Sequence, residues 1–222
     1  MTYPVNNPQQ LTILIINHHH LLLNGTINLV REHFCEAKID SAQSIQETLA
    51  KIQERLPDLI IVDLLLPQTS GGQARVEYGL DLLRKLMQNY PQLNLMVQSS
   101  KIKALIRLIT EIDNHRGGFT IADNSLPIAT LVTRINWAMQ GLTYTKDIKS
   151  DLEVKPEWLE VLRLAFEEGL QDKAIAQAMY KSERMIRHYW SKIQGALQIY
   201  SEEGKNIRTL TQICARQQGL ID

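Results

Sequence analysis

Short apolar runs alternate with longer amphipathic stretches along the first 140 residues. The apolar runs, rich in β-branched residues, cover 11–17, 59–63, 93–97 and, more weakly, 37–40 and 119–121. Apolar positions recur at helical spacing between them, at 22–34, 42–55, 80–90, 101–113 and 128–139. Strands that alternate with helices, without hairpin turns, predict a doubly wound parallel sheet of five strands with helices on both faces.

The pattern changes after residue 140. Residues 141–154 are mostly polar and lack periodicity, which is typical of a linker. Only helical patterns follow: Pro156 starts the first and Gly169 stops it, while Asp172 and Ser182 can cap the second and third. A fourth covers 207–218. We therefore predict an α/β domain at 1–140, a linker at 141–154 and an all-α domain of four helices at 155–222.

The composition is that of a soluble globular protein. The chain has 222 residues, 44% of them apolar, and no run of about 18 apolar residues that could cross a membrane. The first ten residues carry no basic side chain, so we expect a cytoplasmic protein without a signal peptide. Cys35 and Cys214 are far apart, which argues against a disulfide framework or zinc site and predicts two small core residues.

Charge and candidate chemistry narrow the function further. The 24 basic and 24 acidic residues cancel, so any binding to nucleic acid needs a local basic patch. His18, His19 and His20 cannot all face one metal ion, because successive residues at a strand end point in alternate directions. We find no paired nucleophile and base and no glycine-rich phosphate loop. We therefore do not expect an enzyme, and we expect no bound metal ion or other cofactor.

Two of the C-terminal helices, at 172–179 and 183–197, have the spacing of a helix-turn-helix. An inner stripe recurs along the second of them, at Ile186, Tyr189, Trp190, Ile193 and Leu197. The opposite face carries Arg184, Arg187, His188 and Ser191. Arginine can bind guanine O6 and N7 with two hydrogen bonds, so this face is suited to the major groove. Lys173, Lys181, Ser182 and Lys192 are candidates for phosphate contacts, and the alternative is that these charges form only a solvated helix face.

The same segment resembles the LuxR/NarL-type helix-turn-helix. The resemblance rests on matches such as Glu160, Gly169, Lys173, Ile175 and Ser182 in EVLRLAFEEGLQDKAIAQAMYKSERMIRHYWSKIQGALQI. It implies DNA contacts at Arg187, His188, Ser191 and Lys173, and dimerisation through the last helix. Ile207, Leu210 and Cys214 are candidates for that dimer contact, although a face buried within the chain explains the same pattern.

The first 140 residues resemble the receiver domain of two-component response regulators. Asp63, which ends the third apolar run with Pro67 four residues later, matches the phosphate-accepting aspartate. Ser99 matches the switch hydroxyl and Phe119 the switch aromatic residue. The resemblance implies the flavodoxin-like strand order and a site at the carboxyl ends of the strands.

Three departures make this receiver a degenerate one. The positions of the acidic pair that holds Mg²⁺ read Asn17 and His18, and the position of the phosphate-binding lysine reads Ala122. Phosphoryl transfer depends on such cationic help, so Asp63 should accept phosphate poorly and could instead pair with His18 in a pH-sensitive contact. A loop insertion at 68–78 either caps this pocket or is an inert surface loop.

The leading hypothesis is a transcription regulator that binds duplex DNA as a homodimer without Mg²⁺-dependent phosphorylation. A regulatory protein or a small ligand at the altered pocket (Asn17, His18, Ser99, Phe119, Ala122) would then supply the signal. The first alternative is a conventional response regulator controlled by phosphorylation of Asp63. The second is a protein-interaction adaptor that lacks affinity for DNA.

Overall fold

The computed structural model describes residues 10–149 and 155–221 and divides into two compact units. The first contains the residues up to Ser100 together with Asn114–Tyr144, and the second contains Lys101–Asp113 together with the residues from Thr145 on. Residues 1–9 and 222 of the predicted domains, and 150–154 of the predicted linker, lie outside the described part of the chain.

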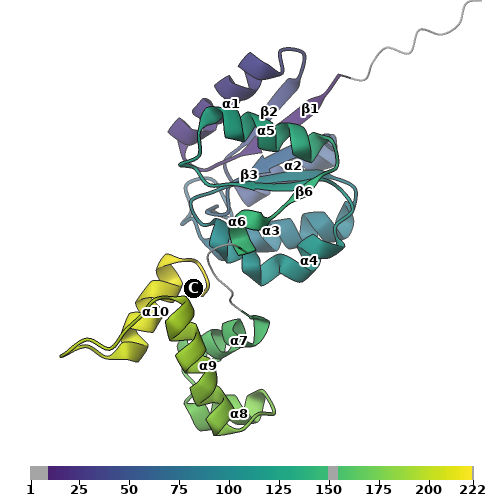
Figure 1. Cartoon of the computed structure of the whole chain (residues 1–222). Coiled ribbons are helices and arrows are strands. Elements are labelled where there is room, and N and C mark those ends of the chain that lie inside the picture. The colour runs from purple at the N-terminus through teal and green to yellow at the C-terminus, as the bar shows by residue number, and fades with distance from the viewer. Residues whose placement is uncertain (1–9, 150–154, 222) are drawn as a thin grey trace, which may run out of the picture. The chain divides into compact units, whose positions relative to one another are not determined.

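The first unit is built on one parallel sheet in the order β2-β1-β3-β4-β5-β6 (Figure 1). Its strands are β1 (Thr12–Ile16), β2 (Lys38–Ala42), β3 (Leu59–Val62), β4 (Asn94–Gln98), β5 (Phe119–Ala122) and β6 (Thr143–Tyr144). The doubly wound order was predicted, but the number of strands was wrong. The sixth strand has only two residues, Thr143 and Tyr144, and pairs with β5 inside the segment predicted as linker.

Helices cover both faces of this sheet (Figure 1). α1 (His20–His33) and α5 (Ile128–Met139) share a core with Ile13, Ile15 and Ile61 of the strands. α2 (Ile45–Glu54) and α3 (Val76–Asn89) contact each other and form the helix pair on the other face. The alternation of side chains along each strand explains this division, because successive residues of one strand face opposite layers.

Two segments differ from the predicted helices. The chain at 101–113 was predicted as one helix, but it forms a 3-10 helix, η1 (Ile102–Leu108), followed by the short α4 (Ile109–Asn114). The middle of the segment predicted as linker, 141–154, contains another short helix, α6 (Lys146–Lys149). Both segments are too short for their type to be read from periodicity.

The four C-terminal helices lie where the pattern predicts them: α7 (Pro156–Phe166), α8 (Asp172–Ala178), α9 (Glu183–Ala196) and α10 (Ile207–Gln217). Pro156 stands in the first turn of α7, and the Ser182 hydroxyl caps α9, as predicted. The N-cap of α8 is Gln171 rather than Asp172, whose carboxylate bonds to other helices instead.

The prediction that both cysteines are core residues is wrong for Cys35, which is exposed, whereas Cys214 is half-buried and packs against the core of the helical unit. In the part of the chain that the structure describes, no helix is long and apolar enough to cross a membrane.

Candidate functional site

A tight turn joins α8 to α9. Tyr180 adopts a left-handed conformation with φ of 54°, and the next amide, of Lys181, donates to the Ala176 carbonyl at 2.8 Å. The Ser182 hydroxyl then accepts a hydrogen bond from the Met185 amide at 3.2 Å, which starts α9. These contacts fix the angle at which α9 leaves the turn.

The inner face of α9 holds it in the core of the helical unit. Ile186, Trp190, Ile193 and Leu197 are buried, and Tyr189 is partly buried against the same cluster. These are the residues of the predicted stripe. Because they recur at helical spacing, the opposite side of α9 is left in solvent.

The predicted DNA-contact residues lie on the outer face of α9, in the turn before it and, for Lys173, on α8. All eight are exposed: Lys173, Lys181, Ser182, Arg184, Arg187, His188, Ser191 and Lys192. Arg187 has one weak ion pair, 4.0 Å from Nη1 to Glu183 Oε2, and the Ser191 hydroxyl donates to the Arg187 carbonyl. Within 10–149 and 155–221, no ion pair neutralises the cations of Lys173, Lys181, Arg184 or Lys192. These charges are therefore free to meet an anionic partner.

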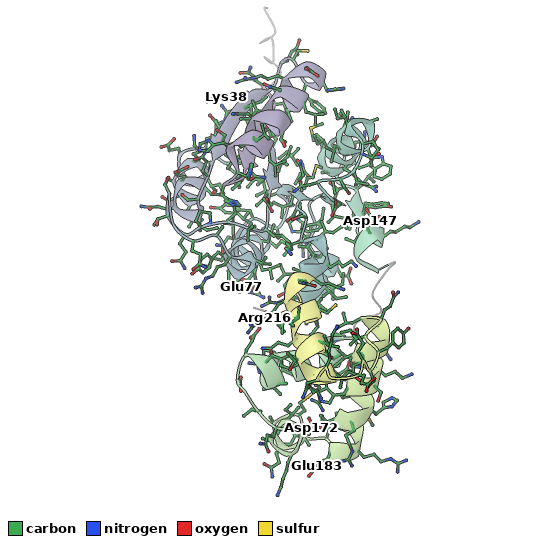
Figure 2. All side chains as sticks on the ribbon, turned by 90° about the vertical axis from the view of Figure 1, so that its left-hand side faces the viewer. Lys38, Glu77, Asp147, Asp172, Glu183 and Arg216 are labelled. Atoms are coloured by element: carbon green, nitrogen blue, oxygen red, sulfur yellow. The ribbon has the colours of Figure 1, made fainter. Side chains whose placement is uncertain are left out.

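Sequence reasoning missed a polar contact behind this face. The Trp190 indole Nε1 donates to Asp172 Oδ1 at 3.0 Å, and Arg208 Nη2 donates to both oxygens of the same carboxylate, at 3.1 and 2.9 Å. The Arg208 guanidinium carbon lies 3.6 Å from the centre of the Trp190 ring. We call these three side chains the interhelix clasp, because they join α8, α9 and α10. Figure 2 shows Asp172 and Glu183 at one end of the helical unit and Arg216 at the other.

The candidate dimer residues line one side of α10. Ile207, Leu210 and Cys214 are half-buried, and Ile213 between them is 48% exposed. Asn206 caps the helix by accepting hydrogen bonds from the Arg208 and Thr209 amides. The stripe is thus only partly covered by its own unit.

A polar cluster lies at the carboxyl ends of the central strands. Asp63 is buried and accepts hydrogen bonds from Asn17 Nδ2 at 3.2 Å, Ser99 Oγ at 2.6 Å and the Leu65 amide at 3.1 Å. The Asn17 side-chain oxygen accepts from the His19 amide. The carboxylate is held by neutral donors of its own chain.

The other residues of the predicted pocket are not gathered around Asp63. The proposed pair with His18 is wrong: in the described chain no hydrogen bond or ion pair joins them, and His18 Nδ1 is buried without a partner. Ala122 is fully buried in the core beneath α1 and α5, and Phe119 is also fully buried. A second buried polar pair, Thr26 Oγ1 to Gln98 Oε1 at 3.2 Å, had no recognisable signal in the sequence.

The loop insertion at 68–78 is ordered. Leu66 and Arg75 form an antiparallel bridge at its base, and the residues between Gln68 and Gln73 are exposed. The carbonyls of Pro67, just before the loop, and of Gln68, its first residue, each accept a hydrogen bond from an amide in the first turn of α2 at 3.0 Å. The start of the loop therefore has a structural task, closing the N-terminus of α2.

Together, these features define a two-part chain: a receiver-like α/β unit with one buried acid at its sheet edge, and a helix-turn-helix unit with an exposed basic face. Residues 13–110 match the family model for the response regulator receiver domain.

The chain is also similar to named regulators over nearly its whole length. It is 24% identical over 216 residues to the transcriptional regulatory protein YdfI of Bacillus subtilis, covering 94% of this chain and 97% of that protein. It is 25% identical over 207 residues to the transcriptional activator protein ExaE of Pseudomonas putida, covering 85% and 91%. A solved complex of the two-component response regulator RcsB with DNA has a TM-score of 0.62 at 16% identity, covering 94% and 98%. At that identity the likeness establishes the fold.

Proposed function

We propose that this protein is a transcription regulator that binds duplex DNA through α9. The observation that carries the proposal is the exposed face of α9, where Arg184, Arg187 and Lys192 stand outside a buried apolar stripe. Relatives named as transcriptional regulators, and a fold shared with a DNA-bound regulator, support it. In this assignment the arginines read bases, while Lys173, Lys181 and Ser182 contact phosphates.

The active form in this proposal is a homodimer. The partly exposed stripe of α10, with Ile207, Leu210 and Cys214, is the candidate contact between subunits. A two-fold axis through such a stripe would present two copies of α9 to successive half-sites of the duplex.

Control by Mg²⁺-dependent phosphorylation does not fit the residues at the sheet edge. Mg²⁺ prefers several anionic oxygens, but the cluster offers the single carboxylate of Asp63. Asn17 and Ser99 already donate to its oxygens, and His18 offers a nitrogen. We therefore propose that signals reach this unit by a regulatory protein or a small ligand.

One observation favours the rival, a conventional response regulator. The Ser99 hydroxyl lies 2.6 Å from Asp63 Oδ1, at the place where a phosphoryl group on that oxygen would need a donor. Incubation of the full chain with acetyl phosphate and Mg²⁺, followed by intact mass measurement, separates the two. We expect no stable adduct. An adduct in the wild type that Asp63→Ala abolishes would establish the rival.

The DNA-binding proposal is tested by mobility shift on mixed-sequence duplexes. The wild type should bind with steep salt dependence, and Arg184→Ala combined with Arg187→Ala should abolish the shift. Arg216→Ala, an exposed arginine at the far end of α10, is the matched control and should bind normally. A folded wild type that shifts no duplex at low salt would reject this function and favour the adaptor.

A further inference from the structure

The interhelix clasp holds Arg208 where a lone cation would be unfavourable. Arg208 is the second residue of α10, and the positive end of the helix dipole repels a cation there. Asp172 offsets this because both of its carboxylate oxygens accept from Arg208 Nη2, at 3.1 and 2.9 Å. The carboxylate also accepts the indole of Trp190, so one acid satisfies groups from two other helices.

Trp190 connects this contact to the outer face of α9. Its side chain is buried, and its ring contacts Phe166, with 5.5 Å between the ring centres, and the Arg208 guanidinium, 3.6 Å from its centre. It follows Arg187 by three positions and precedes Ser191, so it lies one turn from the candidate base contacts. Because these contacts hold Trp190 in place, their loss would shift the packing of α9, and two-point contacts with a base tolerate little displacement.

Arg208 itself is poorly placed to contact phosphate. Its side chain is 37% exposed and is engaged by Asp172, whereas Arg187 is 66% exposed with only a 4.0 Å pair. Arg208 is therefore held within the helical unit, whereas Arg187 is available to an external partner. Loss of Arg208 should change the geometry of α9 while leaving its free charges in place.

We propose that Arg208 and Asp172 are positioning residues that set the orientation of α9 through the ring of Trp190, and so determine how well the protein discriminates between DNA sequences. This inference rests on the proposed DNA binding. It assigns sequence discrimination partly to α10, a helix that carries no candidate base contact.

The test compares two duplexes bound by the full chain. One is the duplex that the wild type enriches from a random-sequence library, and the other is a mixed-sequence duplex of equal length. The variants are Arg208→Lys, Asp172→Asn and the double Asp172→Asn/Arg208→Gln. Arg216→Lys, on the same helix, is the matched control. Lysine keeps the charge of Arg208 but has no planar guanidinium to stack flat on the indole of Trp190.

For Arg208→Lys we expect about tenfold weaker binding to the enriched duplex, unchanged binding to the mixed-sequence duplex and an unchanged salt slope. The double variant should lose less than the summed losses of Arg208→Lys and Asp172→Asn, because both single changes disturb the same Asp172–Arg208 contact. Arg216→Lys should match the wild type. Equal losses on both duplexes with a shallower salt slope would mean a phosphate contact and would overturn the inference. Wild-type discrimination in folded Arg208→Lys would do the same.

A spectroscopic measurement separates this inference from the proposed function. The indole N–H resonance of Trp190, assigned with Trp190→Phe, is followed by NMR together with the backbone amides of α9, without DNA. Arg208→Lys and Asp172→Asn should move both sets of resonances, and Arg216→Lys should move neither. If the wild type binds no duplex, the proposed function fails. The positions of these resonances still decide whether the clasp orients α9, and unmoved resonances overturn it.

Discussion

At the residue scale, the Asp63 carboxylate is held by donors from two neighbouring strands. Asn17 follows β1 and Ser99 follows β4, and both side chains donate to Asp63. His18, the hypothetical partner of Asp63, makes no hydrogen bond to it in the described part of the chain. Such contacts depend on side-chain rotamers, whereas the burial of Trp190 and Ile186 follows from helical spacing.

Removing the Asp63 carboxylate should destabilise the protein whether or not it is ever phosphorylated. Asp63→Ala removes the hydrogen bond with Ser99 and leaves the buried Asn17 amide without this acceptor, which costs about 1–3 kcal/mol. Asp81→Ala, which breaks only an exposed pair with Arg84, should cost less than about 1 kcal/mol. Urea unfolding of both variants measures the difference. Equal midpoints would contradict a structural role for Asp63.

His115 should make the fold sensitive to acid. Burial lowers the pKa of His115 more than its hydrogen bond to the Leu93 carbonyl raises it. Its Nδ1 is buried without a partner, so protonation there would bury an unsatisfied N–H. The unfolded chain takes up this proton near the ordinary histidine pKa of about 6.5 while the folded chain resists it, so the free energy of unfolding should fall as the pH drops below that value.

The measurement for His115 is the urea midpoint at pH 7.5 and pH 5.5. His115→Gln keeps a donor for the Leu93 carbonyl and should lose part of the acid sensitivity. His188→Gln removes an exposed histidine and should keep it. An identical drop in His115→Gln and the wild type would assign the effect to other groups.

At the scale of elements, long periodic segments were predictable and short ones were not. α9 and α5 have apolar stripes over several turns, and the structure places both within a residue or two of the prediction. β6 has two residues, too few for any alternation to be recognised. The start of α3 at Val76, four residues before the predicted start, was hidden because its first turn has few apolar positions.

Gly79 is required by the close approach of α3 to the chain after β3. A Cβ atom at residue 79 would lie 2.1 Å from the Leu64 carbonyl oxygen. Because Leu64 contributes backbone atoms to this clash, the backbone of one of the two segments would have to move. Gly79→Ala should therefore lower the free energy of unfolding by about 1–3 kcal/mol or more. Gly25 of α1 is the control, since nothing lies within 4 Å of its Cβ position.

Gly25→Ala should stabilise the protein by about 0.5–1 kcal/mol, because alanine loses less backbone entropy in a helix. Thermal unfolding ranks the two variants against the wild type. If Gly79→Ala is as stable as Gly25→Ala, the close contact between residue 79 and Leu64 does not exclude a side chain, and the prediction is wrong.

At the scale of the whole molecule, the two-part organisation was visible in the sequence as a change of pattern near residue 140. The sequence could not show that Thr143 and Tyr144 extend the sheet of the first unit. Nor could it show that Lys101–Asp113 is grouped with the C-terminal helices, because that grouping depends on contacts between distant residues. The charge total was informative in another way. With 24 basic and 24 acidic residues, attraction to DNA must come from a local basic patch, and the proposed function assigns it to the outer face of α9 and its neighbours.

The slope of log K against log salt for DNA binding should therefore reflect the contacts of a small set of basic side chains with phosphates. Each chain presents Lys173, Lys181, Arg184 and Lys192 without an ion pair among the described residues, and Arg187 with a weak one. Five cations from each of two subunits set an upper limit of about −9 for the slope of log K against log salt on duplex DNA. Lys192→Gln should make the slope shallower by about 1 for each subunit bound, and Lys205→Gln, whose lysine pairs with Glu202, should leave it unchanged. Titrations of a mixed-sequence duplex between about 50 and 200 mM salt measure both slopes. A slope that Lys205→Gln changes as much as Lys192→Gln would place the DNA elsewhere on the helical unit.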